Sequence, residues 1–319
     1  MSYQARRGNG VHPRALGRWA HARRAATLIE LIIGITLAVA VMVLAVSHVT
    51  RHQRAYDDVM TALDLRARLR DGSQIIAADL RASSPIGDTI LVALDTAVEF
   101  YSSLGASTLC STAAPNRLIL PPDTLPSGRM LSSWLAAPET GDIAVVLADS
   151  TATSSRGWQR ARLTSVTSVP TSAGCPFSGG LLSATDAATP RRAYDLALSP
   201  AVPIAAHRGA PVRVVRRVRY SVYRGSDGKW YLGFRRCTSA CGAIQPVSGP
   251  YQGSPGVPMS LRYFTRSGAR ISGHGPTVDI GRVEIVSRAY YSHPVRLPGM
   301  HAPLVADSEM VDVTLRNRW

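Results

Sequence analysis

The chain has 319 residues, 45% of them hydrophobic, which is enough for one large domain or two modest ones and excludes a chain too small to bury a core. Its 36 Lys and Arg against 21 Asp and Glu give a formal net charge of +15. Such a charge suits phosphate or anionic lipid partners, but the cations are mostly scattered arginines, and a bias in composition explains them better. Six arginines lie in residues 1–25, which hold no acid, so the remainder carries 30 cations against 21 acids, or +9.

Residues 26–47 form an apolar segment with one charged side chain, Glu30. A helix of this length spans about 33 Å, enough to cross a bilayer. Because arginines precede it, the positive-inside rule keeps the N-terminus in the cytoplasm and exports the rest of the chain. An ordinary secretory signal has a shorter apolar core that ends at a cleavage site, whereas this segment continues into a polar helical pattern. A plain signal anchor is the other alternative.

Glu30 separates these alternatives, because a carboxylate within an apolar span costs on the order of a few kcal/mol unless it is paired. If the chain is cut after Ala25, the new amino terminus at Ala26 is cationic, and Glu30 becomes the fifth residue of the mature chain. In a filament, the carboxylate of one subunit then meets the ammonium group of its neighbour, with both charges out of water. An accidental acid near a helix end is the simpler alternative.

These residues carry a family resemblance. The sequence Arg-Arg-Ala-Ala-Thr-Leu-Ile-Glu-Leu at 23–31 resembles the class III signal of type IV prepilins and type II secretion pseudopilins. In that family a basic leader ends in Gly and is followed by Phe-Thr-Leu-Ile-Glu and an apolar helix. The matching residues are Thr27, Leu28, Ile29, Glu30 and Leu31. Two positions differ from the family's usual pattern. Ala25 stands in place of Gly, which keeps the small residue that the family's peptidase needs. Ala26 stands in place of an aromatic residue or Met.

The resemblance implies a structural filament subunit, a minor pilin or pseudopilin that is not an enzyme and needs no metal or cofactor. A prepilin peptidase would cut between Ala25 and Ala26 and methylate the Ala26 amine, and residues 27–31 would serve assembly. The implied partners are that peptidase, other major and minor pilins or pseudopilins, an inner-membrane assembly platform and membrane lipid. The chain would cross the inner membrane once, with a periplasmic or extracellular head, and would prime or tip a type IV pilus or a type II secretion pseudopilus.

The implied fold is α+β and type IV pilin-like, a long N-terminal helix, transmembrane in its first half, packed on an antiparallel β-sheet domain. We expect a basic leader at 1–25, a transmembrane half-helix at 26–47, an amphipathic half-helix at 48–84 and a β-rich head at 85–319. In the last third, a tyrosine-bearing hairpin, two strands and a terminal strand follow in an order that resembles the large minor pilins of the W type and the J-type minor pseudopilins.

The segment after the apolar span keeps a helical spacing of apolar residues up to a stop at Ser83, Ser84 and Pro85. Gly72 is its weak point, where two separate helices are the alternative. After the stop, short β-type runs recur at 97–102, 117–120, 142–148, 160–169, 212–223, 229–235, 260–265 and 282–287. Ser226-Asp227-Gly228 predicts a hairpin. Residues 170–211, rich in Ala, Ser, Gly and Pro, predict a long surface insertion.

Four cysteines, an even number in an exported chain, suggest two disulfides. They allow three pairings, of which we favour a short loop from Cys237 to Cys241 and a bridge from Cys110 to Cys175. A zinc site made of all four is the rival. It usually needs two close pairs, and Cys110 and Cys175 are far apart in sequence.

Two other functions compete with the filament subunit. A pilin that captures DNA or a surface would use arginines such as Arg213, Arg216, Arg217 and Arg219, of which strand alternation places Arg217 and Arg219 on one face and Arg216 on the other. Nucleic acid is therefore a candidate partner. A membrane-anchored enzyme is the third hypothesis, but the sequence has neither a Gly-rich nucleotide loop nor a nucleophile elbow.

The remaining polar candidates have simpler explanations. His48 and His52 form a His-x-x-x-His pair just beyond the apolar span, where interfacial surface histidines are more common than a metal site. The acid pairs Asp142 with Asp149 and Asp307 with Glu309 are accounted for by solvated loops, because nothing in the sequence positions them for acid–base work.

Overall fold

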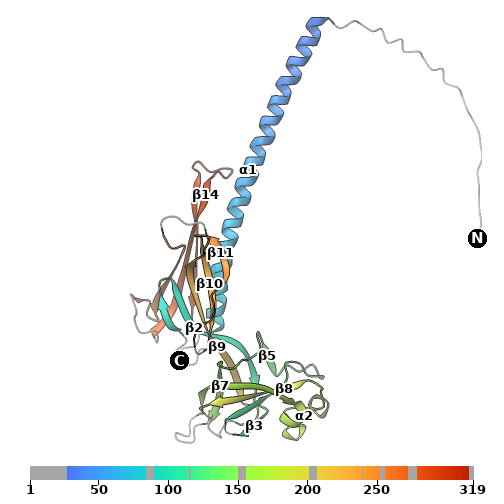
Figure 1. Ribbon diagram of the computed structural model, residues 1–319, viewed down its shortest axis with the longest axis vertical. Coiled ribbons are helices and arrows are strands. Elements are labelled where there is room, and N and C mark those ends of the chain that lie inside the picture. The colour runs from blue at the N-terminus through green and yellow to red at the C-terminus, as the bar shows by residue number, and fades with distance from the viewer. Residues whose placement is uncertain are drawn as a thin grey trace, which may run out of the picture. The chain divides into compact units, whose positions relative to one another are not determined.

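The computed structural model describes residues 27–83, 90–114, 116–149, 156–200, 207–238, 240–251, 256–271 and 279–315. The chain divides into two compact units, Met1–Arg54 and Ala55–Trp319, and each is treated by itself. Helix α1 (Leu28–Ala82), drawn in blue in Figure 1, belongs to both units, because the division falls between Arg54 and Ala55. Antiparallel strands dominate the second unit, so the expected α+β layout with one long N-terminal helix is confirmed.

Helix α1 is continuous through Gly72, so the alternative of two separate helices is wrong. Gly72 is buried, and a Cβ at this position would lie 2.2 Å from the Tyr251 hydroxyl oxygen and 3.2 Å from the Ser248 hydroxyl oxygen. The missing side chain therefore lets the sheet approach the helix backbone. This contact offsets the low helix propensity of glycine.

The helix ends at Ala82, next to the stop predicted from the sequence. The Ser83 hydroxyl donates a hydrogen bond to the Leu80 carbonyl at 2.6 Å, which satisfies one of the carbonyl groups left open at a helix C-terminus. The other two residues of the predicted stop, Ser84 and Pro85, lie outside the described residues.

Within the described residues, the larger sheet has eleven strands, all paired antiparallel. Its main order is β1 (Ile90–Leu94), β2 (Ala97–Thr108), β9 (Pro211–Arg224), β6 (Ile143–Asp149), β7 (Arg156–Pro170), β8 (Arg192–Ser199), β4 (Arg117–Leu120) and β3 (Ser111–Ala114). Three strands branch from this path: β10 (Trp230–Cys237) pairs with β9, β11 (Gln245–Tyr251) with β10, and β5 (Ser132–Trp134) with β2. Strand β9 is therefore the hub of the sheet.

In the part of the chain that the structure describes, the smaller sheet has four strands in the order β13 (Arg270–Ile271), β12 (Met259–Thr265), β14 (Ile280–Val295) and β15 (Leu304–Thr314). The described part of the head thus holds two sheets, where the sequence predicted a helix packed on one antiparallel β-sheet domain. The reason is length: a single open sheet rarely grows beyond about ten strands without splitting or curling.

All eight β-type runs predicted from the sequence fall on strands, with ends displaced by a few residues at most positions. The predicted hairpin is also present: β9 and β10 pair in register from Arg224 opposite Trp230, and Gly228 in the connecting turn has φ +75°. Turn chemistry and hydrophobic runs were sufficient here because both signals are local.

The prediction of a long surface insertion at 170–211 is wrong. This segment contains the short helices α2 (Thr171–Gly174), η1 (Phe177–Gly179) and α3 (Ala184–Ala187), followed by β8. Strand β8 lies inside the sheet between β7 and β4, and Ala193, Leu196 and Leu198 are buried in it. The Ala, Ser and Pro residues around this short strand resemble a loop in the sequence, although both edges of the strand are paired.

The second half of α1 packs on a core that both sheets share. The helix contributes Ala62, Leu65, Leu69, Ile76, Ala77 and Leu80. The larger sheet contributes Val98, Phe100, Val218, Tyr220, Leu232 and Tyr251, and the smaller sheet Leu261, Tyr263, Val283, Ile285 and Val313, among others. Each fully buried Leu or Ile stabilises the fold by about 1.5–3 kcal/mol relative to exposure. A second cluster lies between β4, β6, β7, β8 and β9, around Leu118, Val146, Leu163, Leu196 and Val212.

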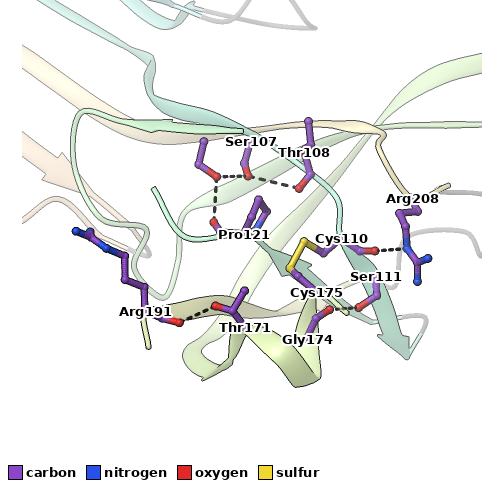
Figure 2. Close-up of a disulfide and its surroundings, with 11 residues drawn as sticks. Ser107, Thr108, Cys110, Ser111, Pro121, Thr171, Gly174, Cys175, Arg191 and Arg208 are labelled. Carbon is purple, nitrogen blue, oxygen red and sulfur yellow. Dashed lines mark hydrogen bonds between the residues drawn. A yellow bond between two sulfur atoms is a disulfide. The ribbon is translucent and has the colours of Figure 1, made fainter. Parts of the chain in front are cut away.

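The structure pairs Cys110 with Cys175 and Cys237 with Cys241, which are the two bridges favoured from the sequence. The first bridge ties the start of β3 to the α2 turn, and the Ser111 hydroxyl supports it by donating to the Gly174 carbonyl at 2.8 Å (Figure 2). It joins residues 65 positions apart and the second bridge residues only 4 apart. In the chain-entropy account, the long bridge stabilises the fold by about 4 kcal/mol and the short one by about 2.

Candidate membrane anchor and assembly site

The first half of α1 exposes apolar side chains on every side. Every residue from Thr27 to Val46 is exposed within the chain, including Leu28 at 77%, Ile29 at 64% and Leu31 at 58%. By length and composition, α1 is long and apolar enough to cross a membrane. A core helix of a soluble protein would bury such residues, so this half needs an apolar environment that the described residues do not supply.

Thr27 and Glu30 form a reciprocal pair of hydrogen bonds at the start of this helix. The Thr27 backbone N–H donates to Glu30 Oε2 at 2.9 Å, and the Glu30 backbone N–H donates to Thr27 Oγ1 at 3.4 Å. This is a capping box, in which a Thr and a Glu three residues apart satisfy two of the open N–H groups of the first turn. The structure thus gives Glu30 a local role that was not predicted from the sequence.

The predicted cleavage and methylation positions, Ala25 and Ala26, lie outside the described residues. The residues predicted to serve assembly lie on the first turns of α1, where Leu28, Ile29 and Leu31 are exposed. The carboxylate is exposed in the isolated chain, so a cationic group from another molecule can reach it.

The histidine pair beyond the apolar span lies on one face of α1. His48 Nε2 and His52 Nε2 are 2.9 Å apart, and both rings are exposed. Among the described residues, three potential ligands approach one another only at Glu99, Cys237 and Cys241. The two cysteines there are joined in a disulfide, so neither offers a thiolate to a metal ion.

The acids considered for acid–base chemistry have other partners. The expectation that Asp142 is a solvated loop residue is wrong, because Asp142 is buried and accepts two hydrogen bonds from Arg216, at 2.7 and 2.8 Å. Asp307 accepts hydrogen bonds from the Arg66 guanidinium at 2.6 Å and from the Tyr291 hydroxyl at 3.2 Å. These contacts hold Asp142 and Asp307 in ion pairs, and the side chain of Asp149 is outside the described residues.

The arginines of β9 divide between the two faces of the sheet as strand alternation predicts. Arg217 and Arg219 share one face, where both reach the carboxylate of Glu99, whereas Arg216 lies on the other face and is buried. The register adds three more arginines to the first face, Arg160 and Arg162 of β7 and Arg235 of β10. These three were not predicted from the sequence, although the Arg-x-Arg spacing at 160–162 in a predicted strand was a signal for a shared face.

Comparison of the chain with protein-family models, with curated proteins and with solved structures finds no match. Function is therefore inferred from the residues of this chain. Two features stand out in the described part: the exposed apolar half of α1 with the Glu30 carboxylate at its start, and the arginine-rich face of the larger sheet.

Proposed function

We propose that this protein is a minor pilin or pseudopilin, a filament subunit that a prepilin peptidase cuts between Ala25 and Ala26. Its apolar half-helix is held in the membrane before assembly and in the filament core afterwards. The β-rich part of the chain, from residue 90 onward, carries the exposed functional surface. Its size suits a subunit that primes or tips a filament more than one that is repeated along a shaft.

One observation supports this proposal most: α1 continues without interruption from an apolar half that is exposed on all sides into a half that is embedded in the head core. An anchor that served only for attachment would not need to continue into the core of the head. In a filament subunit, one helix would serve both the filament core and the head. The motif at residues 27–31 supports the same proposal by resemblance.

Glu30 has two roles in this proposal, and they make different demands on the side chain. As part of the capping box it needs to accept a hydrogen bond from the Thr27 N–H, which a neutral Gln also does. As the partner of a neighbouring Ala26 ammonium it needs a negative charge. An unpaired carboxylate would cost on the order of a few kcal/mol in the filament core, so the charge is expected to have a partner there.

The experiment compares Glu30→Gln and Glu30→Leu in cells that contain the peptidase and the other filament subunits. The control is Asp57→Asn, which removes an exposed acid from the same helix outside the apolar half. The N-terminus of each variant is read by mass spectrometry, its membrane fraction is measured, and sheared filaments are tested for its presence.

We expect all variants to be cut before Ala26 and held in the membrane, since removing a charge does not oppose insertion. Both Glu30 variants should be absent from filaments, or fail to prime them, while Asp57→Asn behaves as the parent. Entry of Glu30→Gln but not Glu30→Leu would assign Glu30 to capping alone. An intact Met1 terminus in the parent would contradict the proposed function itself.

A further inference from the structure

Six arginines gather on one side of the larger sheet. We define this arginine face by Arg160, Arg162, Arg213, Arg217, Arg219 and Arg235. Residues directly opposite each other in antiparallel strands point to the same side. One row across the sheet runs Glu99–Arg219–Arg235, and another runs Arg213–Val145–Arg160. The opposite side of β9 carries Val218 and Tyr220, which pack on α1, so the arginine face points away from the helix.

Among the described residues, the charges of four of these arginines are only partly compensated. Arg217 and Arg219 share one carboxylate, that of Glu99, which is itself 2% exposed. Arg162 donates a hydrogen bond to the Thr238 carbonyl, a neutral group, at 2.9 Å. Within the described part of the chain, Arg235 Nε is buried and has no hydrogen-bond partner.

Arg219 and Arg235 lie directly opposite each other on neighbouring strands. Like charges in this position destabilise a sheet, and a bound anion removes the repulsion. Solubility alone does not require two arginines directly opposite each other on neighbouring strands. The pair therefore points to a ligand with negative charge.

Aromatic rings are interleaved with these arginines. The Arg213 guanidinium lies 5.6 Å from the centre of the Trp158 ring, and that of Arg160 lies 5.4 Å from the centre of the Tyr101 ring. Farther along β9 and β10, two more rings lie opposite each other, with centres 5.8 Å apart, those of Tyr223 and Tyr231. Arginines track phosphates and aromatic side chains stack on bases in proteins that bind single-stranded nucleic acid.

We propose that the arginine face binds single-stranded nucleic acid, with phosphates on the arginines and bases against the aromatic side chains. The same-face residues of β9 from Arg213 to Tyr223 follow one another about every 6.7 Å, and together they extend over roughly 33 Å. This length accommodates several nucleotides. The proposal does not depend on filament assembly, because every residue that carries it lies in the second unit.

The experiment uses the full-length protein in nanodiscs of neutral lipid. Binding of a fluorescein-labelled oligodeoxythymidylate is followed by fluorescence anisotropy at salt concentrations from about 50 to 200 mM. A duplex of the same length and inorganic polyphosphate at equal phosphate concentration serve as competitors. The test variant is Arg213→Gln/Arg235→Gln. The matched control is Arg282→Gln/Arg288→Gln, which removes the same charge from the smaller sheet, where Arg282 and Arg288 also lie over aromatic rings.

We expect the parent to bind the oligonucleotide with an affinity that falls linearly on a log–log plot against salt. The test variant should bind roughly ten- to thirtyfold more weakly at about 0.1 M salt, with a slope shallower by about 1.4, since each phosphate contact contributes about 0.7 for single strands. The control should bind as the parent does. Because the test variant relieves the repulsion between Arg219 and Arg235, its melting temperature without ligand should not fall.

Three results would overturn the proposal: no binding by the parent at the lowest salt, an equal loss of affinity in the control, or competition by polyphosphate as strong as that by the oligonucleotide. The last result would mean that the face recognises phosphate alone. Stronger binding of the duplex than of the single strand would overturn the assignment to single strands.

Discussion

Arg216 and Arg217 are adjacent in sequence, yet they have different surroundings. The side chain of Arg217 is 36% exposed, whereas that of Arg216 is 2% exposed and its guanidinium faces Asp142, which is fully buried. Arg216 also donates to the Ala137 carbonyl at 3.2 Å, and its hydrogen bonds to Asp142 raise the pKa of the Arg216 guanidinium. A bidentate pair with an extra acceptor is the arrangement in which a buried charge is tolerated.

Removing one partner of this pair should be costly. Asp142→Ala leaves the buried Arg216 guanidinium with only the half-exposed carboxylate of Glu139, 3.4 Å away, as a counter-charge. We therefore expect the free energy of unfolding to fall by about 3 kcal/mol, the lower end of the range for a broken buried pair. Glu284→Ala breaks the more exposed pair with Arg262 and should cost about 0–1 kcal/mol. Urea denaturation of the full-length protein in non-ionic detergent measures both. Equal losses would show that the buried pair has no special importance.

Asp79 of α1 and Tyr220 of β9 form a contact between the helix and the larger sheet, and this contact predicts a pH dependence. The Tyr220 hydroxyl donates to Asp79 Oδ2 at 2.6 Å. Burial raises the pKa of Asp79 above its usual value, and the hydrogen bond from Tyr220 opposes this shift. The native protein therefore binds more protons than the unfolded chain between the usual pKa, about 3.9, and the raised one.

The sign follows from that difference in bound protons. The contribution of Asp79 to stability falls as the pH rises from about 4 through the raised pKa, and it stays low above it. Asp79→Asn keeps an acceptor for Tyr220 but does not titrate, so its stability relative to the parent should increase over this window and then level off. Melting temperatures of both proteins from about pH 3.5 to 7 test this, and a constant difference between them would contradict it.

At the scale of elements, Gly72 sets the distance between α1 and β11. In an isolated helix, Gly→Ala is stabilising by about 1 kcal/mol. Here the added Cβ would overlap the Tyr251 hydroxyl, which donates to Ser248 Oγ at 2.8 Å. We expect Gly72→Ala to lower the melting temperature by several degrees and Gly72→Ala/Tyr251→Phe to recover part of the loss, because Phe removes the colliding oxygen.

A matched helix control is Gly34→Ala, since a Cβ at Gly34 would meet nothing within 4 Å. Gly34→Ala should leave the melting temperature of the head unchanged. If Gly72→Ala stabilises the protein instead, the sheet can move away from the helix at little cost, and the close approach is not a constraint on the fold.

The elements that the sequence predicted correctly share one property: their signals are local. The long helix, the eight β-type runs and the hairpin turn at Gly228 were all readable from periodicity and turn residues. Strand β8 was missed because its identity depends on β7 and β4, which pair with both of its edges. Non-local pairing of this kind leaves little trace in a short window of sequence.

The same distinction applies to the candidate sites. The Glu30 carboxylate and the two disulfides came from the sequence, because a charge in an apolar span and an even set of cysteines are conspicuous on their own. Only part of the arginine face could be predicted from the sequence. Strand alternation places Arg216 and Arg217 on opposite sides of β9. It does not show that the pairing of β7 and β10 brings Arg160 and Arg235 to the side of Arg217. The capping box has a local signal, a Thr three residues before a Glu, and it was missed because only the charge of Glu30 was considered.

At the scale of the whole molecule, the boundary between anchor and head falls inside α1 rather than at its end. The unit that starts at Ala55 includes six buried helix side chains that pack with both sheets. The head is therefore incomplete without the second half of the helix. Without the helix, the fold would lose the burial of Leu69, Ile76 and Leu80. The burial of each of these side chains stabilises the fold by about 1.5–3 kcal/mol.

This boundary predicts the outcome of two truncations. Removal of residues 1–54 should give a soluble monomer with one cooperative thermal transition, because the core around Leu69 and Ile76 is retained and the exposed apolar half-helix is gone. Removal of residues 1–82 uncovers Val98, Phe100 and Val218 and should give an aggregated or molten protein. Size-exclusion chromatography and near-ultraviolet circular dichroism distinguish the two states. A soluble, cooperatively melting protein that lacks residues 1–82 would show that the sheets close their own core, and the continuous helix would then be needed only for anchoring.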